Sequence, residues 1–64
     1  MTTLLRLPAV TQRTGLSRSK LYELLERGDF PRPVKAGGGR LNFWPDHEIA
    51  AWIEAQIEAR EAAR

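Results

Sequence analysis

The chain has 64 residues, of which ten are Lys or Arg, eight are Asp or Glu and none is Cys. A chain this short forms one domain at most, and it buries only about 60% of the surface that its unfolded form exposes, so its stability should be marginal. Without cysteine there is no disulfide framework and no thiolate metal site, which fits a reducing compartment such as the bacterial cytosol. No apolar run approaches the roughly 20 residues that span a bilayer, so we expect a cytoplasmic protein without a membrane partner.

The charges divide unevenly along the chain. Residues 1–45 carry eight basic side chains against three acidic ones, whereas residues 46–64 carry two basic side chains against five acidic ones. A positive segment of this kind suggests that a polyanion is its partner.

The first 15 residues predict a short strand followed by a short helix. The alternation over Leu4–Leu7 suits a strand. Pro8 suits the start of a helix, where its missing N–H group would have no partner in any case. The helix should run from about Pro8 to Arg13 and bury Val10. Gly15 should end it, because glycine accepts a positive φ.

A second helix should begin at Arg18. Ser17 is placed to be its N-cap, with the hydroxyl accepting from backbone N–H groups two and three residues later. Gly28 should stop the helix. The outward face is basic and aromatic near its start and acidic near its end, and the inward face carries leucines at helical spacing: Leu21, Leu24 and Leu25.

A hairpin and a last helix complete the predicted elements. Pro31 and Pro33 force an extended path. The hairpin strands should be residues 34–36 and 40–44, joined by a glycine tip at residues 37–39. The last helix should open at Pro45 and Asp46. Residues 58–64 offer nothing larger than alanine to pack, so we expect a frayed helical tail there. The apolar stripe of this helix is spaced for one face: Ile49, Trp52, Ile53 and Ile57.

The two N-terminal helices and their glycine-containing turn predict a DNA-binding site. In a helix-turn-helix, the second helix presents its first residues to the major groove. The N-terminus of a helix attracts phosphates through unpaired N–H groups and a partial positive charge. Arg18, Ser19 and Lys20 add donors at that end, and Tyr22 can pack its ring against a sugar or a base methyl group. The alternative is that the basic pair is merely solvated and that Tyr22 has a packing role.

The hairpin is a second candidate contact, a wing. Its glycine tip would let the backbone approach a duplex closely, and Lys35 and Arg40 flank the tip with positive charge. Arginine can enter a narrow minor groove or hold a phosphate. Arg40 has a structural alternative, which is an ion pair with Asp46 or Glu48.

Several other side chains have structural interpretations. Trp44 and Trp52 could stack on single-stranded bases, but a small chain without disulfides needs large apolar groups in its core. Arg27 lies where a cation stabilises a helix C-terminus without any ligand. His47 has no second His or Cys with which to share a metal, so we expect neither a metal nor another cofactor.

The segment RLPAVTQRTGLSRSKLYELLERGDFPRPVKAGGGRLNFWPDHEIAAWI resembles the AlpA-type phage regulatory proteins. These are small winged-helix proteins related to phage excisionases and to the DNA-binding domains of the MerR class. The resemblance runs from about Leu5 to Ile53. It is carried by four features in order: TGLSRSKLY, GDFPRPVK, the spacing from Arg40 to Trp44, and EIAAWI.

The resemblance implies the roles of particular positions. Arg18, Ser19, Lys20 and Tyr22 would belong to the recognition helix, Lys35 and Arg40 to the wing, and Trp44 and Trp52 to the core behind it. Two departures stand out. The family commonly has an acidic residue before the valine of its first helix, where this chain has Pro8 and Ala9, and its wing tip usually holds fewer glycines.

The sequence therefore predicts a small α+β fold, with residues 1–64 forming one winged helix-turn-helix domain. The expected function is sequence-specific binding of double-stranded DNA as a transcriptional regulator of a phage, a prophage or another mobile element. An excisionase that bends attachment-site DNA and works with an integrase is the alternative within the same class. A different class also stays open, a protein-interaction module that binds an acidic partner.

Size bears on the expected partners. One such module contacts DNA over only about 600–1,000 Å² of protein surface, so we expect self-association on DNA, as a dimer or a cooperative array. Enzymatic activity is not expected, because the chain has no nucleophile beside a base, no paired carboxylates and too little length to enclose a small-molecule substrate.

Overall fold

A proline and a glycine bound the first helix. The computed structural model describes residues 1–63, and helix α1 occupies Leu7–Thr14. Gly15 adopts a left-handed conformation with a φ of 75°, and its N–H group donates to Thr11 O over 2.8 Å, as predicted. Leu7 was expected in the strand but lies in α1, because the N–H group of Val10 donates to Arg6 O and so includes Leu7 in the first turn.

Helix α2, Arg18–Glu26, has caps at both ends. The Ser17 hydroxyl accepts from the backbone N–H group of Lys20 over 3.1 Å, which confirms the predicted N-cap. At the other end Gly28 has a φ of 78°. The N–H groups of Gly28 and Asp29 donate to Leu25 O and Leu24 O respectively, which is the Schellman pattern of helix termination. Glycine therefore ends α2 as predicted.

The loop after α2 is anchored by the two tryptophans. The indole N–H group of Trp44 donates to Pro31 O over 2.8 Å, and that of Trp52 donates to Asp29 O over 2.9 Å. The Phe30 ring lies edge-on to both indoles, with centroid separations of 6.5 Å to Trp44 and 5.0 Å to Trp52. Trp44 is fully buried and Trp52 packs against the core, so both have the structural role that the sequence predicts.

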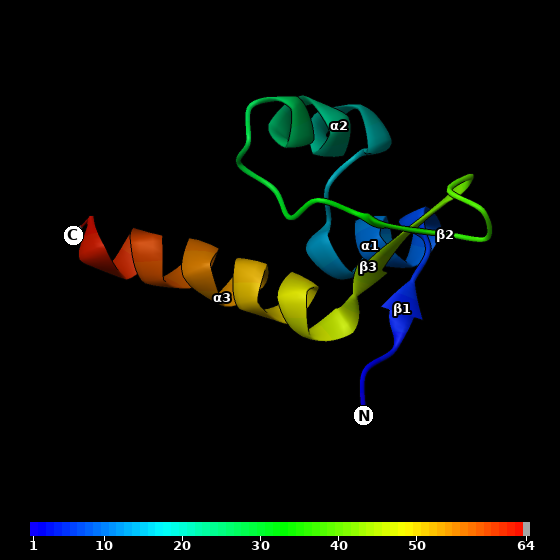
Figure 1. Ribbon diagram of the computed structural model, residues 1–64. Coiled ribbons are helices and arrows are strands. Elements are labelled where there is room, and N and C mark those ends of the chain that lie inside the picture. The colour runs from blue at the N-terminus through cyan, green and yellow to red at the C-terminus, as the bar shows by residue number, and fades with distance from the viewer. Residues whose placement is uncertain (64) are drawn as a thin grey trace.

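Three short strands form one antiparallel sheet in the order β1-β3-β2 (Figure 1). The strands are β1, Leu4–Leu5, β2, Val34–Ala36, and β3, Leu41–Pro45. Arg40 was expected in the return strand but lies in the turn, and β3 continues one residue beyond Trp44. The extension follows from pairing with β1, since Leu4 lies opposite Pro45 and Asp46 N–H donates to Thr3 O over 2.9 Å.

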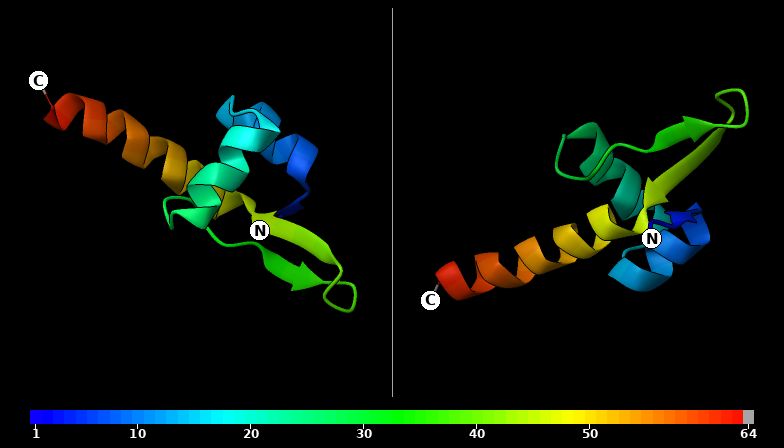
Figure 2. Two further views of the ribbon diagram at one scale, coloured as in Figure 1. Left: turned by 90° about the horizontal axis from the view of Figure 1, so that it is seen from above. Right: turned by 60° about the horizontal axis from the view of Figure 1, so that its bottom comes forward.

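Helix α3, Asp46–Ala62, buries only its first turns. Pro45 is its N-cap rather than its first residue. Ile49 is fully buried, whereas Ile57 is 42% exposed, so the predicted apolar stripe is buried only up to Ile53. Figures 1 and 2 show that α3 extends away from the other elements, so its C-terminal part has no element to pack against. The helix continues to Ala62; the fraying expected after Ile57 stays a prediction, and residue 64 lies outside the described residues.

The core joins five of the six elements, and β2 contributes no buried side chain. The expected small α+β class is confirmed, with three helices and a three-stranded sheet among residues 1–63. The hairpin tip and the C-terminal end of α3 lie at opposite ends of the molecule (Figure 2), whose longest axis is 45 Å. The buried side chains of the core are all apolar: Leu5, Val10, Leu21, Phe30, Trp44 and Ile49.

Candidate nucleic-acid interface

The start of α2 gathers three of the predicted DNA-contacting residues at one exposed helix end. Arg18, Ser19 and Lys20 are the first three residues of α2, and all three are exposed. Ser17 caps one backbone N–H group, and the helix dipole leaves this end partially positive. Leu21 directly after them is fully buried and fixes the helix to the core. The geometry therefore presents cationic and hydroxyl donors on a rigid support.

Tyr22 lies one turn further along the same helix and beside Arg18. The Arg18 guanidinium carbon lies 6.0 Å from the centroid of the Tyr22 ring, at the outer limit of a cation–π contact. Tyr22 is half-buried. The Tyr22 ring therefore lies beside the Arg18 guanidinium and stays partly accessible.

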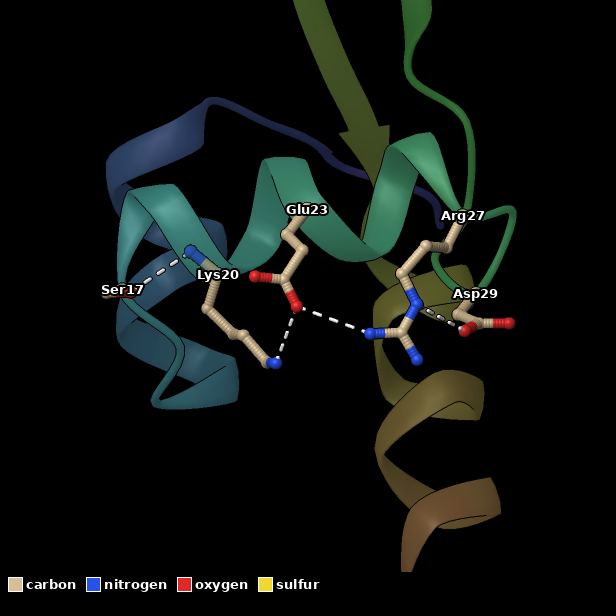
Figure 3. Close-up of polar contacts among 5 residues, drawn as sticks. All are labelled: Ser17, Lys20, Glu23, Arg27 and Asp29. Atoms are coloured by element: carbon tan, nitrogen blue, oxygen red, sulfur yellow. Dashed lines mark hydrogen bonds and ion pairs between the residues drawn. The ribbon is translucent and has the colours of Figure 1, made fainter.

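A chain of ion pairs runs along α2 from Lys20 to the loop after the helix (Figure 3). The Lys20 ammonium lies 2.8 Å from Glu23 Oε2, and Arg27 Nη1 lies 3.3 Å from the same oxygen. Arg27 Nε in turn lies 3.5 Å from Asp29 Oδ2. The hydrogen bond from Lys20 and then the charge of Lys20 lower the pKa of Glu23, and Arg27 lowers it further. Glu23 is therefore held as a carboxylate between two cations.

The β2–β3 hairpin carries the other two predicted residues. Lys35 and Asn42 face each other across the hairpin, and the Lys35 ammonium donates to Asn42 Oδ1 over 2.6 Å. Arg40 is exposed in the turn, which is built from three glycines with φ values of 62°, 79° and 86°. Side chains at these positive φ values would be strained, so glycine makes this short turn possible.

Two structural alternatives from the sequence have different outcomes. Within residues 1–63, Arg40 forms no ion pair with Asp46 or Glu48, so its charge is unneutralised. Arg27 forms ion pairs with Glu23 and with Asp29, which agrees with the structural role considered for it.

Most cations of the first 45 residues lack an acidic partner among residues 1–63. Only Lys20 and Arg27 are paired there, and Arg60 of α3 pairs with Glu61. The positive potential of this part of the chain is therefore available to an external polyanion. The unpaired cations are Arg6, Arg13, Arg18, Arg32, Lys35 and Arg40.

Sequence reasoning missed two features of this surface. One is Glu23 as the hub of the ion-pair chain, although the spacing of three and four residues to Lys20 and Arg27 is the spacing at which helix side chains meet. The other is Arg6, whose guanidinium carbon lies 5.2 Å from the centroid of the Phe43 ring on β3. No local pattern could have indicated that contact, because it depends on the pairing of β1 with β3.

Other kinds of site are not built by the described residues. Residues 1–63 contain no group of three or more His, Cys, Asp or Glu side chains that could hold a metal ion. None of the helices in the same range combines the length and the hydropathy that a membrane span requires.

The comparisons with known proteins agree with the resemblance seen in the sequence. A curated relative, "Uncharacterized protein ORF88" of Enterobacteria phage P4, is 42% identical over 57 residues, which are 89% of this chain and 64% of the relative. The chain thus spans just under two thirds of that relative's length. No solved structure matches. Residues 3–57 match the family described as "Prophage CP4-57 regulatory protein (AlpA)", and the chain belongs to this family of phage regulatory proteins.

Proposed function

We propose that the protein is a sequence-specific, double-stranded DNA-binding transcriptional regulator of a phage, a prophage or another mobile element. In this proposal residues 1–64 act as a single winged-helix module. Helices α1 and α2 with the turn at residues 15–17 form the helix-turn-helix, and the β2–β3 hairpin is the wing. Family membership supports the regulatory part of the proposal.

The observation that carries DNA binding is the exposed N-terminal turn of α2. Arg18, Ser19 and Lys20 stand together there, on a helix whose opposite face is locked into the core through Leu21. A rigid helix end with this chemistry matches what the major groove requires, since arginine and lysine donate to guanine and phosphate oxygens and serine to either. Tyr22 adds a flat surface for a sugar or a base methyl group.

The hairpin supplies a second, electrostatic contact in this proposal. Lys35 and Arg40 have no acidic partner within residues 1–63. Strand β2 contributes no buried side chain to the core, whereas β3 contributes Trp44, so the outer strand and the tip of the hairpin are the parts that the core does not use. A projecting basic hairpin of this kind suits the phosphate backbone or the minor groove beside the major-groove site.

The excisionase alternative uses the same residues and the same fold. It differs in the position of the bound sites, which would flank an attachment site rather than a promoter, and in an integrase as a further partner. In either role we infer that several protomers assemble on DNA, because the contact area of one module is small.

Selection of binding sites from a random double-stranded DNA pool, followed by titration of the selected duplex, tests the proposal. We expect a defined motif, with the logarithm of the binding constant falling by about 0.9 per phosphate contact for each unit of log salt concentration. No enrichment at low salt would reject DNA binding and favour the module that binds an acidic protein. Mapping the motif onto promoters or attachment sites separates the regulator from the excisionase.

A further inference from the structure

Glu23 is an acidic side chain on a helix that otherwise offers cations to DNA. Its carboxylate lies 2.8 Å from the ammonium of Lys20, which is one of the proposed DNA contacts, and 3.3 Å from Arg27 (Figure 3). A phosphate that approaches Lys20 must therefore either meet this carboxylate or displace it. The contact is accessible, because the Lys20 and Glu23 side chains are 49% and 52% exposed.

We propose that Glu23 is a specificity-determining residue of the DNA-binding surface, which neutralises Lys20 and Arg27 against non-specific phosphates and reads a base amino group at the selected site. The inference rests on the proposed function and names what this carboxylate contributes to it. Non-specific binding to DNA comes almost wholly from the attraction between protein cations and phosphates. Because Glu23 neutralises two of these cations, the affinity for non-specific DNA is lower.

The selected site differs because it offers the carboxylate a new donor. In the major groove the N4 amino group of cytosine donates to Glu or Asp side chains. Once a base amino group replaces Lys20 as the donor to Glu23, the lysine is free for a phosphate. Exposed ion pairs at helical spacing are weak, so the exchange costs little. At a wrong sequence no cytosine amino group lies at the position that Glu23 reaches. The carboxylate then either stays on Lys20 or faces phosphate oxygens and base acceptors that repel it.

Glu26 provides a matched control on the same helix. It is exposed and has no ion pair within residues 1–63, so Glu26→Gln removes one negative charge from α2 without releasing a cation. Glu23→Gln removes the same charge, releases Lys20 and leaves Arg27 with only its longer ion pair to Asp29. Glutamine is about as good a helix former as glutamate, so both variants should keep the fold, and circular dichroism verifies this.

The experiment titrates the wild-type protein and both variants with the selected duplex and with a scrambled duplex of the same composition, at several salt concentrations. We expect Glu23→Gln to tighten binding to the scrambled duplex by about three- to fivefold more than Glu26→Gln does, as loss of two weak pairs implies. The salt dependence should steepen by about one to two phosphate contacts. The preference for the selected duplex should fall, and a repeated site selection with Glu23→Gln should lose a cytosine preference at one position.

The outcomes separate this inference from the proposed function. If Glu23→Gln and Glu26→Gln behave alike on both duplexes, Glu23 has no special role and the inference is wrong, although DNA binding stands. Equal tightening on both duplexes would reject the specificity role, because the carboxylate would then be a general repulsive charge. Failure of the wild-type protein to bind either duplex at low salt would reject both the proposed function and the inference.

Discussion

Arg18 and Lys35 differ in their surroundings and should differ in what their removal does to DNA binding. Arg18 stands at the start of α2, where a base edge is within reach in the proposed complex. Arg18→Ala should weaken binding to the selected duplex by about 1–3 kcal/mol and relax the preference at one base position. Titration of a panel of single-base variants of the duplex measures both effects.

Lys35 lies on the hairpin with Asn42 as its partner and should act on phosphate alone. Lys35→Ala should weaken binding to all duplexes nearly equally and reduce the salt dependence by about one phosphate contact. Arg60→Ala, at the far end of α3, removes the same charge and should change neither quantity on a duplex with a single site. Equal behaviour of the Arg18 and Lys35 variants would contradict the division between base reading and backbone contact.

The lowered pKa of Glu23 predicts a pH dependence of stability. A carboxyl group whose pKa is lower in the folded chain stabilises the fold above its unfolded pKa, and this contribution is lost as the pH falls through the folded pKa. Glu23→Gln should therefore reduce the acid sensitivity of thermal unfolding, whereas Glu26→Gln should retain it. Thermal unfolding from neutral to acid pH measures the difference, and parallel curves for the two variants would argue against the ion-pair chain.

At the scale of the element, the start of α2 depends on one hydroxyl. Ser17→Ala removes the acceptor for the Lys20 N–H group and should lower the free energy of unfolding by about 1 kcal/mol. Ser19→Ala, two residues later, removes an exposed hydroxyl that accepts no capping bond and should change stability by less than about 0.5 kcal/mol. Urea unfolding compares the two variants. If the Ser19 variant lost as much stability, the cap would not be the cause.

Helix α3 consists of a buried part and a projecting part, and one substitution distinguishes them. Ile49→Ala should cost about 2–5 kcal/mol because Ile49 is fully buried, while Ile57→Ala should cost less than about 1 kcal/mol because Ile57 is 42% exposed. A chain of this length has a total stability of about 3–10 kcal/mol, so Ile49→Val, at about 0.5–1.5 kcal/mol, is the milder probe. Similar costs at both positions would show that the far end of α3 packs against something.

The elements that the sequence predicted correctly are those with local causes. Ser17, Gly15, Gly28 and the glycine tip act on backbone within a few residues of themselves, so their effects could be read from the sequence. The pairing of Leu4 with Pro45 could not be read from the sequence, because these residues lie far apart along the chain and meet only in the complete fold. That pairing is what moved the end of β3 and the start of α3.

The candidate site divides in the same way. The exposure of Arg18, Ser19 and Lys20 follows from helical periodicity and the cap, and the structure places these residues where periodicity predicts. Outside the site, the exposure of Ile57 does not follow from the sequence, because a stripe at helical spacing indicates which face is apolar and not how far a neighbouring element extends along it.

At the scale of the whole molecule, the shape follows from the small size of the core, which includes neither the hairpin tip nor the far end of α3. The core is built from one side chain in each of β1, α1, α2, β3 and α3 together with Phe30, and the hairpin and the far end of α3 project from it in opposite directions (Figure 1). The radius of gyration is 12.4 Å, against about 11 Å for a compact chain of this length. The molecule therefore offers surface at both ends that its own core does not use.

This shape bears on how the proposed complex reaches useful affinity. One module contacts DNA over about 600–1,000 Å², and a single contact area of this size rarely gives tight specific binding. Protomers on adjacent sites would add contacts between their projecting ends without enlarging the footprint of each. We expect a duplex with two correctly spaced sites to be bound cooperatively. The second protomer should then bind at a lower protein concentration than it would at an independent site. A gel titration that compares one-site and two-site duplexes measures this, with a two-site duplex of altered spacing as the control. Tight, non-cooperative binding of the isolated site would show instead that one protomer suffices, and contacts between protomers would then have no part in recognition.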